Sequence, residues 1–152
     1  QTVEMQRRSF EFQLELARAS GLPVIVHSRD ATEETLAILR EKKPQRGIMH
    51  CFPGDSRDAK RFLDLGFYIS FAGNVTFRAA TQIQDAARYV PDNRILTETY
   101  APFLTPVPLR GKTNRCEYIR HTIDFIASLR QVKAEVLEDR IAENFNALCE
   151  RK

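Results

Sequence analysis

The sequence predicts an α/β fold built on a parallel sheet, and two observations lead to this class. Four short apolar runs alternate along the chain with longer segments that have helical periodicity. Strands that alternate with helices are joined by right-handed crossovers, which place the strands parallel in one sheet. In addition, polar residues directly follow each apolar run, so they are expected to gather at one edge of that sheet.

The first half of the chain opens with a helix predicted over residues 2–19, which ends at Gly21. Its apolar face is formed by Val3, Phe10, Leu14 and Ala17. A buried strand follows at residues 23–26. Asp30 is then expected to cap a second helix, with Glu33 three residues later completing a capping box.

The remaining strands are expected at residues 47–49, 67–70 and 95–99. One helix begins at Asp55 or Ser56 and ends at Gly66, and another spans residues 81–89. After a proline-rich loop, two closing helices show apolar stripes, which are Ile119, Ile123, Ile126 and Leu129 in the first and Leu137, Ile141, Phe145 and Leu148 in the second. Four such strands fit half of a (β/α)₈ barrel or a small doubly wound sheet. Polar residues after every strand favour the half barrel.

Composition sets broad limits on the class of protein. The 152 residues are expected to form a single domain, 1–152, with 43% hydrophobic residues to build its core. The net charge of +3 is compatible with a phosphate-bearing substrate but does not require one. Three cysteines without CxxC spacing indicate reduced thiols and a cytoplasmic protein. No apolar run is long enough for a membrane span, so no membrane partner is expected.

Two histidines follow successive strands and are the principal candidates for a functional site. His27 ends the first apolar run and His50 ends the second, with one helix between them. The carboxyl ends of neighbouring parallel strands meet at one edge of the sheet, where such folds build ligand and metal sites. A single histidine in this position more often satisfies a buried hydrogen bond. Two equivalent histidines favour a divalent metal.

Five further residues are weaker candidates, and each has a structural alternative. Glu98 follows the fourth strand, where it is expected either to bind metal or act as a base, or to form a surface ion pair. Arg29 is expected to assist His27 or to contact an anionic substrate. Arg110 and Lys112 flank a glycine in a basic turn, which suits phosphate binding but is also common on surfaces. Cys51 has only His50 as a neighbouring base, so packing is the favoured interpretation of its thiol.

Three segments in the correct order resemble the TatD family of metal-dependent deoxyribonucleases. They are the segments 22–31, 50–54 and 101–114, which read LPVIVHSRDA, HCFPG and APFLTPVPLRGKTN, and the segments 66–70, with Gly73, and 144–148 are similar as well. The resemblance implies an amidohydrolase-type (β/α)₈ barrel with two divalent ions (Mg, Mn or Zn) that hydrolyse phosphodiester bonds in DNA.

Individual roles are also implied by the resemblance to this family. His27 and His50 correspond to metal ligands on the fifth and sixth strands of the barrel. Arg110, Lys112 and Asn114 correspond to a loop near the substrate phosphates. The chemistry implied is activation of water by the metal and stabilisation of charge on the scissile phosphate.

The chain departs from the family pattern in two respects. A His-x-His pair and a glutamate, which the family carries in its amino-terminal strands, have no counterpart here, so we expect the chain to be the carboxyl-terminal part of a longer protein. Tyr100 replaces the aspartate of a Glu-Thr-Asp-Ala-Pro motif that binds metal and acts as general base. A neutral phenol does not readily take that proton.

These departures lead to an expectation of an inactive or impaired site and of a partner for the half barrel. The exposed sheet edges are expected to pair with the missing amino-terminal half or to self-associate. Three functions therefore remain open: a deoxyribonuclease, a non-catalytic barrel relic that binds a partner, and an amidohydrolase of small molecules.

Overall fold

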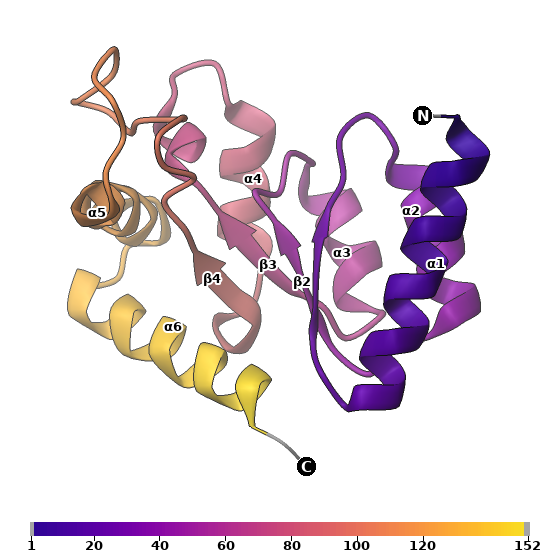
Figure 1. Cartoon of the computed structure of the whole chain (residues 1–152). Helices are drawn as coiled ribbons and strands as arrows, with labels where there is room; N and C mark the ends of the chain where they lie inside the picture. Colours follow the sequence, from indigo (N-terminus) through magenta and orange to yellow (C-terminus); the bar gives the residue numbers. More distant parts are fainter. Residues whose placement is uncertain (1, 151–152) are drawn as a thin grey trace.

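The computed structural model describes residues 2–150, and its four strands form one parallel sheet in sequence order (Figure 1). The strands are β1 (Val24–His27), β2 (Gly47–His50), β3 (Tyr68–Phe71) and β4 (Ile95–Thr97). The helices are α1 (Val3–Ser20), α2 (Thr32–Lys42), α3 (Ser56–Leu63), α4 (Thr81–Tyr89), α5 (Ile119–Arg130) and α6 (Ala134–Cys149). Short 3₁₀ helices lie at Gly73–Thr76, Asp92–Arg94 and Cys116–Tyr118. The predicted alternation of four strands with helices is confirmed.

The two faces of the sheet are covered to different extents. Alternate residues of a strand point to opposite faces, so Met49 packs into the large core with the helices while its neighbour Ile48 points the other way. On this second face Leu148 of α6 packs against Ile48, Tyr68 and Leu96. Ile141 of the same helix packs here too, but toward β1 the face is open, and the Ile25 side chain is 70% exposed. The sheet therefore corresponds to half of a barrel, and this second, incompletely covered face corresponds to the barrel interior.

The predicted cap of α2 is wrong, whereas the cap of α3 is confirmed. Asp55 accepts hydrogen bonds from the backbone amides of Arg57 and Asp58 at the start of α3. Asp30, in contrast, lies outside the cap of α2, which is Ala31 without a side-chain bond. The turn after β1 holds Asp30 at φ 54°, and the carboxylate of Glu33 instead pairs with Arg61 of α3 at 2.5 Å.

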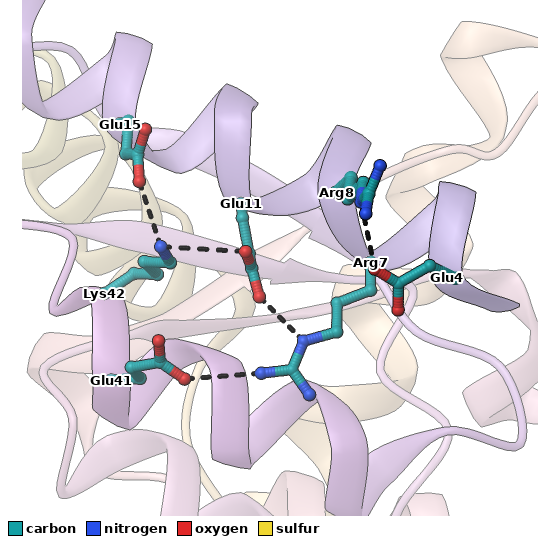
Figure 2. A network of polar contacts seen from close by, with 7 residues as sticks. All are labelled: Glu4, Arg7, Arg8, Glu11, Glu15, Glu41 and Lys42. Atoms are coloured by element: carbon teal, nitrogen blue, oxygen red, sulfur yellow. Dashed lines mark hydrogen bonds and ion pairs between the residues drawn. The ribbon is translucent and has the colours of Figure 1, made fainter.

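Helix α1 is joined to α2 by charged side chains as well as by apolar packing. Figure 2 shows a network of charged side chains, in which Glu11 and Glu15 reach Lys42 while Arg7 bridges Glu11 and Glu41, with Arg8 and Glu4 paired alongside. Leu14 is buried as predicted, but Val3, in the first turn of α1, is 80% exposed. Met5, Phe12 and Leu16 also remain exposed.

The closing helices form as predicted, with one exception on the apolar stripe of α6. Leu137 and Leu148 are buried, whereas Phe145 is 53% exposed at the open inner face. Asn144 supplies an anchor that the apolar pattern does not reveal, because its side-chain amide donates to the backbone carbonyls of Asp92 and Ile95, both at 2.8 Å. This holds α6 against the start of β4. None of the helices in residues 2–150 has the length and hydropathy needed to cross a membrane.

Candidate metal centre

The two candidate histidines lie side by side at the carboxyl edge of the sheet. His27 and His50 are the last residues of β1 and β2 and are direct partners in the parallel register. Their ring centroids are 5.6 Å apart. The side chain of His50 is 32% exposed, and His27 is exposed at the outer strand. The predicted meeting of the two imidazoles at one sheet edge is confirmed.

Glu98 lies directly beside His50. Its Oε1 is 2.9 Å from Nδ1 of His50, and its Oε2 accepts a hydrogen bond from the backbone amide of Cys51 at 3.2 Å. The Glu98 side chain is only 17% exposed. Although Nδ1 is close, Oε1 has no well-aligned donor among the described residues. The carboxylate thus faces His50 rather than a basic residue on the surface, which excludes the surface ion pair as its role.

Tyr100 packs on the face of the same imidazole. Its ring centroid is 5.3 Å from that of His50, with the two rings inclined by 22°, and 6.5 Å from that of His27. Tyr100, Cys51 and Asp30 all have positive φ, which non-glycine residues rarely adopt, and all three follow the strands that carry the site. Three of the six non-glycine residues at positive φ in the described part of the chain thus follow these strands.

Cys51 has the properties of a packed thiol. Burial, reinforced by the negative charge of Glu98, raises the pKa of Cys51 to about 12. Thiolate is the nucleophilic form, so a thiol with so high a pKa is inert near neutral pH.

The cationic candidates come from the loops after β1 and β4. Arg29 is almost fully exposed, and its Nε lies 3.7 Å from Oδ2 of Asp30. The guanidinium carbon of Arg110 lies 3.8 Å from the ring centroid of Phe77, and Lys112 is exposed. In the described part of the chain, none of these three groups forms a hydrogen bond or an ion pair with His27 or His50.

Asn114 has a structural function in the loop after β4. It is 4% exposed, and its side-chain amide donates to the carbonyls of Thr99 and Phe103 while its Oδ1 accepts from the amide of Arg115. Both amide protons are used within the chain, so this side chain has no donor left for a phosphate. Its contribution is to fold the loop that carries Tyr100.

Two further polar residues lie beside the site, of which Ser70 was expected among the polar residues at the strand ends and Thr97 was not singled out from the sequence. Ser70 and Thr97 border, together with His50 and Glu98, a cavity of about 460 Å³ on the open face of the sheet. Thr97 Oγ1 is buried without a hydrogen-bond partner in the described part of the chain. The only available signal was position, because Thr97 ends β4 and Ser70 lies near the end of β3.

The donors present fit part of a divalent metal centre. Imidazole that offers one nitrogen to a carboxylate and the other to an ion is a common arrangement in metal proteins. Within residues 2–150, however, no three His, Cys, Asp or Glu side chains are grouped closely enough to hold an ion. Among the described residues, the two imidazoles could thus form only part of the ligand set of such a centre.

Comparison with known proteins supports both the fold and the class of this site. Residues 1–150 match the family described as TatD related DNase. The chain is 48% identical over 150 residues to the uncharacterized metal-dependent hydrolase YcfH of Escherichia coli K12, covering 97% of this chain and 57% of that protein. It is 39% identical to the uncharacterized metal-dependent hydrolase YabD of Bacillus subtilis, covering 95% and 58%.

Solved structures give the same result for the fold. The crystal structure of YJJV, a TATD homolog from Escherichia coli K12, superimposes with a TM-score of 0.91 at 29% identity, over 96% of this chain and 57% of that one. A TatD family hydrolase from Entamoeba histolytica matches with a TM-score of 0.86 at 16% identity, over 99% and 58%. The chain thus spans 57–58% of the length of these four proteins, in agreement with a partial barrel.

Proposed function

The chain belongs to the TatD related DNase family, and from this premise we propose that it is part of a metal-dependent hydrolase that cleaves phosphodiester bonds in DNA. The observation that carries the proposal is the in-register pair His27 and His50 at the carboxyl edge of a parallel sheet. Relatives named metal-dependent hydrolases support the metal and the hydrolytic reaction. The choice of DNA as substrate follows from the family description.

His27 and His50 are the residues that would hold the metal. When bound, a divalent ion such as Mg, Mn or Zn polarises a phosphoryl oxygen and makes water more acidic. Glu98 is fixed against His50 and Cys51, so in this mechanism it acts on the imidazole. Arg29, Arg110 and Lys112 would attract the phosphate backbone by their charge.

Tyr100 lowers the activity in this proposal. It takes the place of an aspartate of the family motif, and a phenol is a poorer proton acceptor than a carboxylate. Its ring also covers one face of His50. We therefore expect the protein to be a weak nuclease, in which the carboxylate has been lost and the histidine pair retained.

The test compares DNA cleavage by the full-length protein, its Tyr100→Asp variant and its Tyr100→Phe variant, with Mg²⁺ or Mn²⁺ added. The proposal predicts that Tyr100→Asp increases the cleavage rate while Tyr100→Phe does not. Metal binding without DNA cleavage in all three proteins would refute a nuclease. Absence of both metal binding and cleavage would support a non-catalytic barrel relic instead.

The open sheet face and the two sheet edges are the surface that we assign to the remaining part of the barrel. β1 and β4 are the outer strands in the described residues, and the exposed apolar side chains of Ile25 and Leu16 border one hollow along β1. The relatives carry further sequence beyond the 57–58% that this chain spans, which supplies an occupant of suitable size. Closure of a barrel removes free strand edges.

Amide hydrogen exchange tests this assignment. If the remaining segment pairs with β1, the outward amides of Val24–His27 are protected in the full-length protein and exchange rapidly in the isolated chain. Equal exchange in the two proteins would refute the docking. Self-association of the isolated chain, detected by light scattering, would identify a second copy as the occupant.

The free state of all three cysteines supports a cytoplasmic location for the protein.

A further inference from the structure

We propose that Glu98 is a positioning residue that fixes the tautomer and the orientation of His50, so that Nδ1 carries the proton and Nε2 is presented to the metal. The inference rests on the proposed metal site but concerns a residue that would not itself bind the ion. Its starting observation is the contact of 2.9 Å between Oε1 of Glu98 and Nδ1 of His50.

The unpartnered oxygen of Glu98 explains why the proton belongs on Nδ1. Oε1 is buried and has no well-aligned donor among the described residues, and a buried acceptor without a donor is unfavourable. A proton on Nδ1 of His50, the atom 2.9 Å from this oxygen, supplies the missing donor once the ring is aligned with it. The proton then cannot be on Nε2 of the neutral ring, which leaves the Nε2 lone pair free.

The backbone holds the carboxylate in place for this function. The amide of Glu98 donates to the carbonyl of Phe71 at 3.0 Å, which ties the residue to β3 just after β4 ends. On the other side, Cys51 adopts φ 46°, and its amide donates to Oε2 of Glu98. Because a positive φ at cysteine is unfavourable, this turn is retained at an energetic cost that the amide–carboxylate bond offsets.

The imidazole is also restricted on its face. Tyr100 stacks against His50 at a centroid distance of 5.3 Å, so the ring is bounded by an aromatic face and, in its own plane, by a carboxylate. With both oxygens of Glu98 directed at His50 and Cys51, the carboxylate is not free to coordinate an ion at the mouth of the site. This distinguishes a positioning function from the direct roles of ligand or base.

The tautomer can be measured directly on the metal-free chain by long-range ¹H–¹⁵N correlation of the histidine rings. The proposal predicts the Nδ1–H form for His50 in the wild-type chain, with its preference reduced in Glu98→Gln and abolished in Glu98→Ala. A predominant Nε2–H form in the wild-type chain would overturn the proposal. The wild-type readout requires neither a variant nor activity, so it is independent of whether DNA is the substrate.

A second measurement is the affinity of the full-length protein for Zn²⁺ and Mn²⁺ by competition with a chelating dye. Loss of a residue that orients a metal ligand typically weakens binding by about 10- to 100-fold. We expect this loss in Glu98→Gln, and no more than about a twofold change in the matched control Glu138→Gln, which removes a carboxylate bordering the same cavity. Equal affinities of Glu98→Gln and Glu138→Gln would contradict a positioning function.

Discussion

The attachment of α6 to β4 depends on one buried side chain, and replacing Asn144 by alanine tests this. The Asn144 side chain is 6% exposed, and its amide bonds the carbonyls of Asp92 and Ile95 across a sequence separation of about 50 residues. Alanine removes both donors and leaves two carbonyl groups without their partner. The perturbation is therefore local, with no change of charge.

The expected loss of stability follows from the number of hydrogen bonds removed. At about 1 to 1.5 kcal/mol for each hydrogen bond, Asn144→Ala should lower the free energy of unfolding by about 2 to 3 kcal/mol. With a urea dependence of about 2 kcal/mol per molar for a domain of this size, the midpoint of unfolding falls by about 1 to 1.5 M.

Urea denaturation followed by circular dichroism measures this effect. Asn146→Ala is the matched control, because Asn146 lies on the same helix with its side chain exposed, and it should change the stability by less than about 0.5 kcal/mol. Equal midpoints for Asn144→Ala and Asn146→Ala would show that the two bonds do not anchor α6, and the reasoning would be refuted.

Three other perturbations test separate parts of the structure. Gly73→Ala should destabilise the chain by about 1 to 3 kcal/mol in the same urea assay, because its added Cβ would lie 2.2 Å from the carbonyl oxygen of Leu104; wild-type stability would refute this close approach. Cys51 should resist iodoacetamide at pH 8 in the native chain and react after unfolding, as followed by mass spectrometry, because its pKa is raised to about 12; rapid native labelling would contradict its burial. The hydrogen bond from Arg7 lowers the pKa of Glu11 in the folded chain, so its stabilising contribution is present above the ordinary value of 4.5 and is lost as the pH falls through the lowered pKa. Melting temperatures measured from pH 7 to pH 3 should therefore decline less in Glu11→Gln than in the wild-type chain, and parallel declines would contradict this linkage.

The sheet and the histidine pair were predictable because they depend on local and regular patterns. Apolar runs at helix-length intervals define parallel strands, and the polar residue after each strand must lie at the same edge. His27 and His50 are therefore brought together by the topology, whatever the details of packing. The same regularity placed α3 correctly behind Asp55.

The errors of prediction arise where a long-range contact or a special backbone conformation determines the outcome. Asp30 was expected to cap α2, but the turn places it at positive φ, and Glu33 binds Arg61 of another helix. Asn144 and Asn114 form hydrogen bonds to distant carbonyls, which no periodic pattern reveals. Glu98 was recognised as a candidate, yet only the structure shows that its carboxylate faces Nδ1 of His50.

The central claim is that His27 and His50 together bind a divalent metal. It is tested most directly by titrating Zn²⁺ into the full-length protein and into its His27→Asn, His50→Asn and His121→Asn variants, the last being a control on α5. Removal of a residue that orients a metal ligand weakens metal binding by up to about 100-fold. Removal of a direct ligand, in His27→Asn or His50→Asn, should weaken Zn²⁺ binding by more than this, whereas His121→Asn should bind Zn²⁺ as the wild type does. Equal affinity in all four proteins would contradict the claim.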